Sequence, residues 1–237
     1  MQNPTVSVEP SSPVSWYDTG GTKVIPREAQ GVVTNSHAIR ELRAALTLSN
    51  NQREVLVGTL LGDGSLVANS WKRNYRLQAE QSHPQKEYLF WKYQIFQEFT
   101  LSRPKFRERT NAWRFRTISH PEFTEYAHRF YTAGRKVVPL VISRLLKSPM
   151  SLAIWYLDDG ALSSRKDTFI LNSQSFSRAE NLLLQQCLLK NFGISVTLNR
   201  DRHYWRLYVG KRSADRFRDL IQPYVVASMR YKLPVAP

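Results

Sequence analysis

The stretch Leu56–Gly64 reads LVGTLLGDG, and a second stretch of the same design, LAIWYLDDG, occupies Leu152–Gly160. Each is an apolar run that ends in an aspartate followed by a glycine. A run that is apolar on nearly every face is normally buried against other elements. A carboxylate at the end of such a helix is repelled by the negative end of the helix dipole. The two aspartates, Asp63 and Asp159, are therefore predicted to serve chemistry; the alternative is that each Asp-Gly pair only marks a turn.

Local signals predict that both runs are helices. Ser49–Gln52 has the form of a capping box, and Ser148 is an N-cap candidate followed by proline at the first helical position. Both predicted helices end at a glycine, as helix C-termini often do. In the first run Gly58 and Gly62 are four residues apart, so one helical face lacks side chains and a second backbone can approach it closely.

If the two helices pack in parallel around a pseudo-twofold axis, Asp63 and Asp159 meet at the same end. Two carboxylates at short distance repel each other, so either one is protonated or a cation lies between them. Oxygen ligands without cysteine or histidine favour Mg²⁺ over zinc. The motifs therefore predict a magnesium site.

Composition indicates the kind of partner. The chain has 237 residues with 34 Lys and Arg against 19 Asp and Glu, a net charge of +15 and a pI near 10.1. The charge is spread along the chain, which favours a polyanionic partner, with nucleic acid ahead of a membrane. No stretch approaches the roughly 20 apolar residues of a membrane span. The single cysteine, Cys187, excludes disulfides within the chain and cysteine-based zinc fingers.

The chain also repeats itself. Lys136 and Lys232, each shortly before a proline, are 96 residues apart, the same separation as between Asp63 and Asp159. Such a constant offset indicates an internal duplication. We expect an α+β protein with a flexible N-terminal extension over 1–34, a first half over 35–147 and a second half over 148–237.

Alternating strand patterns predict a basic sheet surface in each half. In 112–118 aromatic residues alternate with arginines, and in 204–209 apolar residues alternate with arginine and tyrosines. Arginine can pair bidentately with guanine, although many such side chains contact only phosphates. A basic, strand-like segment also follows the first motif. The predicted DNA-binding residues are Arg114, Arg116, Arg202, Tyr204, Arg206 and Tyr208, with Lys72, Arg73 and Arg76.

These features together resemble the LAGLIDADG homing endonucleases, in the single-chain branch that carries two motifs. Beyond the two nonapeptides, the resemblance includes PMSLAIWYLDDG, ILNSQSF and the closing YKLP, and it covers roughly residues 48 to 235. It implies two pseudo-symmetric αββαββα halves that form a DNA-binding saddle, with the motif helices at their interface. The motif's third position departs from the family pattern in the second copy, where it is Ile154, and the sixth is Leu61 or Leu157 rather than acidic. These departures concern how closely the helices approach.

The resemblance also implies roles for individual residues. Asp63 and Asp159 match the catalytic acids that bind divalent metal, and the backbone carbonyls of Gly62 and Asp158 are expected to complete the coordination. Lys136 and Lys232 match basic residues near the active sites; the alternative for each is a solvated loop lysine. The expected reaction is Mg²⁺-dependent hydrolysis of a long asymmetric duplex site by a monomer, with short 3′ overhangs, in support of intron homing.

Two other functions compete with the nuclease. The first is an RNA-binding maturase that helps an intron fold, for which intron RNA would be a partner. The second is a DNA-binding regulator without chemistry. Both acids and both lysines are intact, which favours the nuclease. Family habit suggests a mitochondrial or chloroplast location, with the bacterial cytoplasm as the alternative.

Overall fold

The computed structural model describes residues 37–70 and 73–234. The chain divides into two compact units, Met1–Leu46 and Thr47–Pro237. The described part of the first unit is one helix, α1 (His37–Ala45); the apolar spacing of Ile39, Leu42 and Leu46 predicts a longer helix, over 36–48. The predicted extension over 1–34 and Lys72 lie outside the described residues, and the predicted half boundaries stay predictions.

The first half of the second unit alternates helices with strand pairs. Its order is α2 (Asn50–Leu61), β1 (Ser65–Ala68), β2 (Tyr75–Ser82), α3 (Lys86–Ile95), β3 (Lys105–Arg107), β4 (Ala112–Arg116) and α4 (Pro121–Phe130), with short 3₁₀ turns η1 (His83–Gln85), η2 (Gln97–Phe99) and η3 (Glu108–Thr110) between them. A two-stranded hairpin, β5 (Tyr131–Thr132) and β6 (Arg135–Lys136), and a short helix α5 (Ile142–Leu145) lead to the second half.

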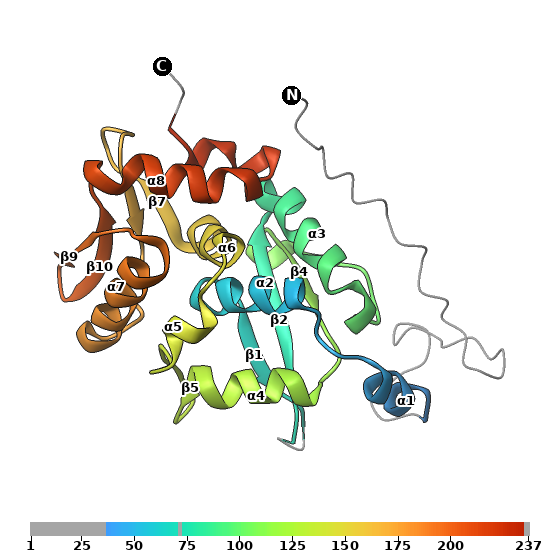
Figure 1. Cartoon of the computed structure of the whole chain (residues 1–237). Helices are drawn as coiled ribbons and strands as arrows, with labels where there is room; N and C mark the ends of the chain where they lie inside the picture. Colours follow the sequence, from blue (N-terminus) through green and yellow to red (C-terminus); the bar gives the residue numbers. More distant parts are fainter. Residues whose placement is uncertain (1–36, 71–72, 235–237) are drawn as a thin grey trace, which may run out of the picture. The chain divides into compact units, whose positions relative to one another are not determined.

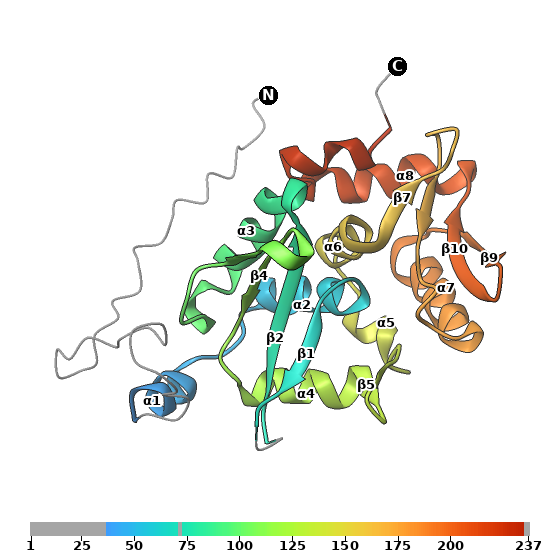
Figure 2. The same ribbon diagram turned by 180° about the vertical axis from the view of Figure 1, so that it is seen from behind.

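The second half repeats this order. It runs α6 (Pro149–Asp159), β7 (Gly160–Leu162), β8 (Phe169–Leu171), α7 (Arg178–Phe192), β9 (Val196–Asp201), β10 (Tyr204–Val209) and α8 (Lys211–Ile221), and it closes with η4 (Gln222–Tyr224) and η5 (Ala227–Lys232). The antiparallel sheets have matching strand orders, β1-β2-β4-β3 and β7-β8-β10-β9. The predicted α+β fold with two αββαββα halves is confirmed. Figures 1 and 2 show α2 and α6 side by side between the two sheets.

The helix starts follow from the capping residues that the sequence showed. The Ser49 hydroxyl accepts from the Gln52 amide while the Gln52 side chain accepts from the Ser49 amide, and Ser148 caps α6 ahead of Pro149. Both capping predictions are confirmed. From Val55 to Leu61 on α2 and from Ser151 to Asp158 on α6 every residue is buried, so these helices form the centre of the core.

Some element boundaries differ from the expectation. The apolar and aromatic spacing of residues 86–100 predicts one helix, but α3 ends at Ile95 and a 3₁₀ turn follows. The apolar run over 140–146 also predicts a helix, of which only α5 is found. The β5–β6 hairpin was not predicted, because residues 121–131 read as one helix that ends before Gly134. Its turn depends on Ala133 and Gly134, both with positive φ (49° and 79°), and alanine gives no signal for such a turn. Among the described residues no helix has the length and apolarity that a membrane crossing requires.

Candidate active site

Small residues let α2 and α6 pack with their backbones close together. A Cβ on Gly58 would lie 2.5 Å from the Ser151 carbonyl oxygen, and one on Gly62 would lie 2.3 Å from the Asp158 Cβ. At the start of the contact the Ser151 hydroxyl donates to the Glu54 carbonyl (2.9 Å). The contacts advance in the same direction along both helices, so both helices end at the same place. The close approach expected from the two glycines is therefore found.

The glycines that follow the acids serve packing rather than backbone conformation. Neither has a positive φ among the described glycines. A Cβ on Gly64 would lie 2.2 Å from the Thr59 Cγ2, and one on Gly160 would lie 2.0 Å from a ring carbon of Tyr156. The general preference for glycine at helix C-termini, which we used in the sequence analysis, therefore does not explain Gly64 and Gly160. Glycine is required at both positions because no space exists for a side chain.

The two acids interact electrostatically. Desolvation, followed by repulsion from Asp63 and Asp158, raises the pKa of the half-buried Asp159 to about 7. Asp63 is more exposed than Asp159. Desolvation of its partly buried carboxyl group, followed by repulsion from Asp158, nevertheless raises the pKa of Asp63. Both carboxylates are therefore harder to ionise than ordinary aspartates, and a bound cation would remove that penalty.

Both lysines that the family resemblance placed near the acids bind backbone carbonyls at the ends of the motif helices. The Lys136 ammonium donates to the carbonyls of Gly62 (2.8 Å) and Gly64 (2.7 Å). The Lys232 ammonium donates to the carbonyls of Leu157 (2.6 Å) and Asp158 (3.3 Å). Burial lowers the pKa of both lysines, while the neighbouring aspartates oppose that shift. The alternative of solvated loop lysines is wrong for both positions, because each amine is held by backbone next to an acid.

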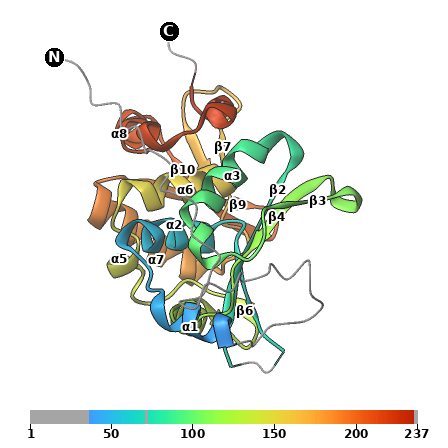
Figure 3. The ribbon, with the colours of Figure 1, turned by 90° about the vertical axis from the view of Figure 1, so that its right-hand side faces the viewer.

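A buried ion pair lies directly beside this site. The Lys92 ammonium contacts both oxygens of Asp158, at 2.6 and 2.8 Å, and both side chains are almost completely buried. The Gln81 amide donates to Asp158 Oδ1 and to Asp63 Oδ2, each at 3.1 Å. Gln81 therefore links Asp63 of the first half to Asp158 of the second half, whose partner Lys92 also comes from the first half. Figure 3 shows α3, which carries Lys92, next to the central helices.

The sequence analysis missed Gln81 and Lys92, although signals existed. Gln81 precedes Gln174 by 93 residues, close to the repeat offset. Lys92 follows Tyr88 by four residues and Leu89 by three, which places it on the apolar face of its helix. A charge on such a face predicts a buried partner, because a buried unpaired charge is unfavourable. The identity of that partner has no sequence signal.

The donor set suits a hard cation. Within 37–70 and 73–234 no cluster of three or more histidine, cysteine or acidic side chains stands ready for a metal. Asp158 is occupied by Lys92, which leaves the carboxylates of Asp63 and Asp159 and the carbonyls of Gly62 and Asp158. These are all oxygen ligands, and in this structure the two carbonyls accept from the lysines. A few protein oxygens supplemented by water or phosphate are the usual environment of Mg²⁺.

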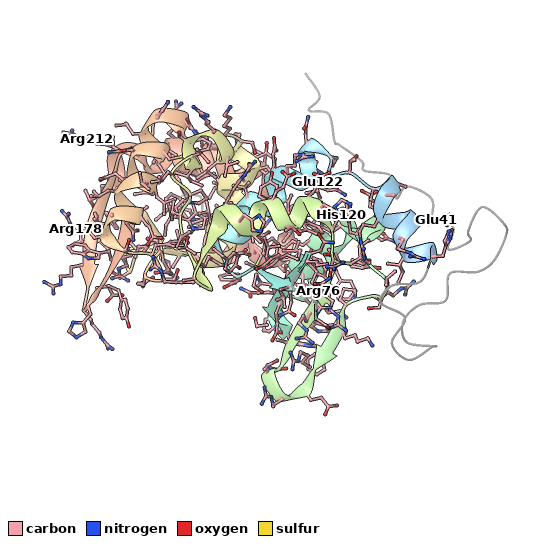
Figure 4. All side chains as sticks on the ribbon, turned by 90° about the horizontal axis from the view of Figure 1, so that it is seen from below. Glu41, Arg76, His120, Glu122, Arg178 and Arg212 are labelled. Atoms are coloured by element: carbon pink, nitrogen blue, oxygen red, sulfur yellow. The ribbon has the colours of Figure 1, made fainter. Side chains whose placement is uncertain are left out.

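The predicted DNA-binding residues of the first half lie on one side of its sheet. Glu80 pairs with Arg114 and Gln78 with Arg116 in adjacent strands, so these side chains share a face, opposite to the buried Phe115. Arg76 belongs to the same face by alternation along β2 (Figure 4). Arg73 is exposed in the β1–β2 connection.

In the second half, Tyr204, Arg206 and Tyr208 alternate with the buried Leu207 and Val209, as predicted. Arg202 is in the β9–β10 turn with φ of 56°. A shallow cavity of about 300 Å³ lies over this face and also contains Arg165 and Lys211, which the sequence analysis did not select. Figure 4 shows Arg178 at the outer end of this half, away from Arg76.

Comparison with known proteins agrees with this geometry. The model of the LAGLIDADG DNA endonuclease family matches residues 53–217, more than half of the chain. DNA endonuclease I-ChuI of Chlamydomonas applanata is 32% identical over 211 residues, covering 79% of this chain and 96% of that protein. Cytochrome b mRNA maturase bI2 of Debaryomyces hansenii is 26% identical over 196 residues, covering 78% and 74%. The structure of homing endonuclease I-WcaI bound to its DNA recognition sequence matches with a TM-score of 0.78 at 25% identity, covering 88% of this chain and 97% of that one.

The chain belongs to the LAGLIDADG DNA endonuclease family. The predicted family and the predicted class of enzyme, a DNA endonuclease, are thereby confirmed.

Proposed function

We propose that this chain is a homing endonuclease that cuts both strands of a long asymmetric DNA site as a monomer and promotes mobility of the intron that encodes it. The observation that carries the proposal is the double site at the ends of two packed helices: Asp63 and Asp159, with Lys136 bound to the carbonyls on either side of Asp63 and Lys232 bound to the two carbonyls before Asp159. Two such acid and lysine pairs, one from each half, match the two phosphodiester bonds of a duplex.

Magnesium fits the donor set, and the proposed ligands are the carboxylates of Asp63 and Asp159 with the carbonyls of Gly62 and Asp158. Bound Mg²⁺ would supply Lewis acidity toward the scissile phosphate and the attacking water. The two acids hold the negative charge that attracts the ion. The two lysines would leave the carbonyls to which they now donate when those carbonyls take up a cation.

The lysines then have a second task. The ammonium group of each lysine interacts electrostatically with the nearby aspartates. Because each lysine is largely buried, water screens its positive charge only weakly. A positioned cation that faces the developing charge on phosphate stabilises the transition state without reorganisation. We assign this role to Lys136 on one DNA strand and to Lys232 on the other. Cleavage of both strands would give a double-strand break, for which the family resemblance implies short 3′ overhangs.

DNA binding is assigned to the two sheets. The net charge of +15 gives the long-range attraction. On the first sheet we assign contacts to Arg73, Arg76, Arg114 and Arg116, and on the second to Arg202, Tyr204, Arg206 and Tyr208. The two surfaces carry different side chains, so the half-sites that they contact need not be the same. The I-WcaI structure, which is a complex with DNA, supports this assignment.

The maturase remains the second candidate, because one similar protein is named an mRNA maturase. Its partner would be a folded intron RNA, and it needs neither acid. A regulator that binds DNA without cutting is the third. The organellar location, with the bacterial cytoplasm as the alternative, remains a prediction.

The test is cleavage of a randomised duplex library in Mg²⁺ by the native protein and by Asp63→Asn and Asp159→Asn. We expect discrete double-strand cuts at one long sequence, and loss of cutting or nicking alone in each variant. Arg178→Gln, at the outer end of the second half, is the matched control and should cut normally. Absence of cutting with retained metal-independent binding to structured RNA would replace the nuclease with the maturase.

A further inference from the structure

We propose that Glu180 and Glu87 are reciprocal positioning residues, each of which holds in place the segment that carries the lysine of the other half's site. Glu180, in the second half, positions Lys136, and Glu87, in the first half, positions Lys232. The inference rests on the proposed function for its purpose, because it concerns the placement of the two site lysines. Its geometry does not depend on cleavage.

Glu180 joins the second half to the segment around Lys136. One carboxylate oxygen accepts from the Val138 amide (3.1 Å), and both accept from the Arg135 guanidinium (3.2 Å each). Arg135 and Val138 lie on either side of Lys136 in the chain, so the carboxylate holds the segment through the Arg135 side chain on one side and the Val138 backbone amide on the other. Glu180 is 8% exposed, so its hydrogen bond from the Val138 amide is shielded from water, whereas the Arg135 side chain is 58% exposed and its ion pair is partly screened.

The rest of the Lys136 segment is tied to the first half by hydrogen bonds. Lys136 pairs with Tyr131 across the β5–β6 hairpin, and the Tyr131 hydroxyl accepts from the Leu66 amide on the edge strand β1 (3.0 Å). A two-stranded hairpin is marginally stable by itself. Glu180 therefore supplies the anchor on the side that faces the second half.

Glu87 has the corresponding place in the first half. It precedes Glu180 by 93 residues, the separation that also relates Gln81 to Gln174, and both glutamates lie in the first turn of the helix that follows a strand pair. Glu87 accepts from the Ser228 amide (3.0 Å) in η5, the turn that ends at Lys232. Its neighbour Gln85 donates to the Tyr231 hydroxyl (2.9 Å). Figures 1 and 2 show η5, at the red end of the chain, next to the start of α3.

The two anchors are unequal in strength. Glu180 is buried and accepts from two residues of the Lys136 segment, Arg135 and Val138, whereas Glu87 is exposed and accepts from one amide. Hydrogen bonds to a charged group contribute more when water is excluded. Lys232 is also secured within its own half, since the Tyr156 hydroxyl donates to its carbonyl (2.6 Å). Loss of Glu180 should therefore free Lys136 more than loss of Glu87 frees Lys232.

The experiment measures how fast each lysine of the native, full-length protein reacts with an amine-directed acylating reagent, without DNA or metal, by peptide mass spectrometry. The variants are Glu180→Gln, Arg135→Met and Glu87→Gln. Ser177→Ala is the matched control, because Ser177 and Glu180 form the capping box of α7 and this variant weakens the cap without touching Arg135 or Val138. The almost fully buried Lys92 reports global opening.

We expect Glu180→Gln to raise the labelling rate of Lys136 about tenfold, since local opening scales with the hydrogen bonds that close it. Lys232 and Lys92 should stay unchanged, Arg135→Met should act in the same direction more weakly, and Ser177→Ala should leave Lys136 unchanged. Glu87→Gln should raise the labelling rate of Lys232 by about twofold and leave the labelling rates of Lys136 and Lys92 unchanged. DNA affinity in EDTA should be unaltered by Glu180→Gln, while the single-turnover cleavage rate falls and nicked product accumulates.

The proposal is overturned if Glu180→Gln affects Lys136 no more than Ser177→Ala does. It is also overturned if the labelling rates of Lys136, Lys232 and Lys92 all rise together in Glu180→Gln, because that pattern indicates global opening of the protein. A protein that shows the expected labelling but never cuts DNA would keep the positioning role and remove the proposed function. The two failures are therefore distinguishable.

Discussion

Replacement of Lys92 by methionine tests the buried ion pair beside the active site. Methionine preserves most of the apolar length of the lysine but removes the ammonium that lies 2.6 and 2.8 Å from the Asp158 oxygens. Asp158 would keep the Gln81 amide as a hydrogen-bond donor, with the buried Tyr88 hydroxyl as a neutral neighbour, but no cation would remain against its carboxylate. Its side chain is 0% exposed, so water cannot replace the missing partner without a rearrangement.

The expected magnitude follows from that burial. Removal of one partner of a buried ion pair costs about 3–5 kcal/mol, because the remaining charge is uncompensated. A natural domain has a total stability of about 5–15 kcal/mol, so Lys92→Met should remove about a fifth of it or more. Asp158→Ala should be similarly damaging, since it leaves the ammonium buried. The double variant should be more stable than either single variant, because no charge is left without a partner.

The assay is urea unfolding of the four proteins of this double-mutant cycle, followed by circular dichroism and by tryptophan fluorescence. Coincident transitions by both probes would establish two-state unfolding, and an unchanged slope against urea would assign the midpoint shift to stability. Gln185→Met is the matched control. Gln185 follows Lys92 by the same 93 residues that relate Gln81 to Gln174, and its amide donates to the Val196 carbonyl (2.6 Å). We expect it to cost about 1 kcal/mol, the loss of one neutral hydrogen bond.

Two results would refute the reasoning. In one, the free energy of unfolding of Lys92→Met differs from that of the native protein by less than about 1 kcal/mol, the contribution of an ordinary hydrogen bond. In the other, the double variant loses as much stability as the two single variants together, which means that the two side chains do not interact energetically. Either result would show that the pair does not stabilise the junction of the halves.

Three further predictions concern the centre of the site. The pKa of Asp159, about 7, lies above its ordinary value of 3.8, so the folded protein holds this proton more tightly than the unfolded chain and metal-free stability falls as the pH rises from about 4 to 7. The stability difference between native protein and Asp159→Asn should therefore change with pH in urea titrations at pH 5 and 8, and a pH-independent difference would contradict the shift. Gly62→Ala should lower the unfolding midpoint by the equivalent of about 1–3 kcal/mol, because the added methyl overlaps the Asp158 side chain; an unchanged midpoint would mean that the helices are further apart than the structure shows. Ala133→Gly should raise stability by about 0.5–1 kcal/mol by thermal unfolding, since alanine adopts a positive φ in the β5–β6 turn, and a decrease would indicate that backbone entropy outweighs the relieved strain.

The sequence predicted the parts of the molecule that are encoded locally or repeated. The helix starts follow from residues adjacent in the chain, such as Ser49 with Gln52. The strands with Arg206 and Arg114 follow from alternation. The place of Lys136 and Lys232 near the active sites was implied by the family resemblance, and the repeat offset of 96 residues relates their contacts with Gly62 and Asp158.

The parts that were missed depend on contacts between the halves, which no local pattern encodes. The β5–β6 hairpin has an alanine at a position of positive φ, and its lysine-bearing strand is tied to Glu180, more than 40 residues later. Lys92 could be recognised as a charge on an apolar face, but its partner Asp158 is 66 residues away in the other half. In each case the chemistry of one residue is known from the sequence and its partner is set by the tertiary fold.

The departures from the repeat identify where the halves have become dependent on each other. Asp158 corresponds to Gly62 at the repeat offset, and Gly62 has no room for a Cβ because Asp158 fills that space. Lys92, which neutralises Asp158, comes from the first half, where Gly62 itself needs no such partner. A pair of identical halves would place two carboxylates or two glycines at this junction, and two carboxylates there would repel while two glycines would leave a void. The present combination therefore requires two different halves, and we expect that neither half would retain its central packing if it were paired with a copy of itself.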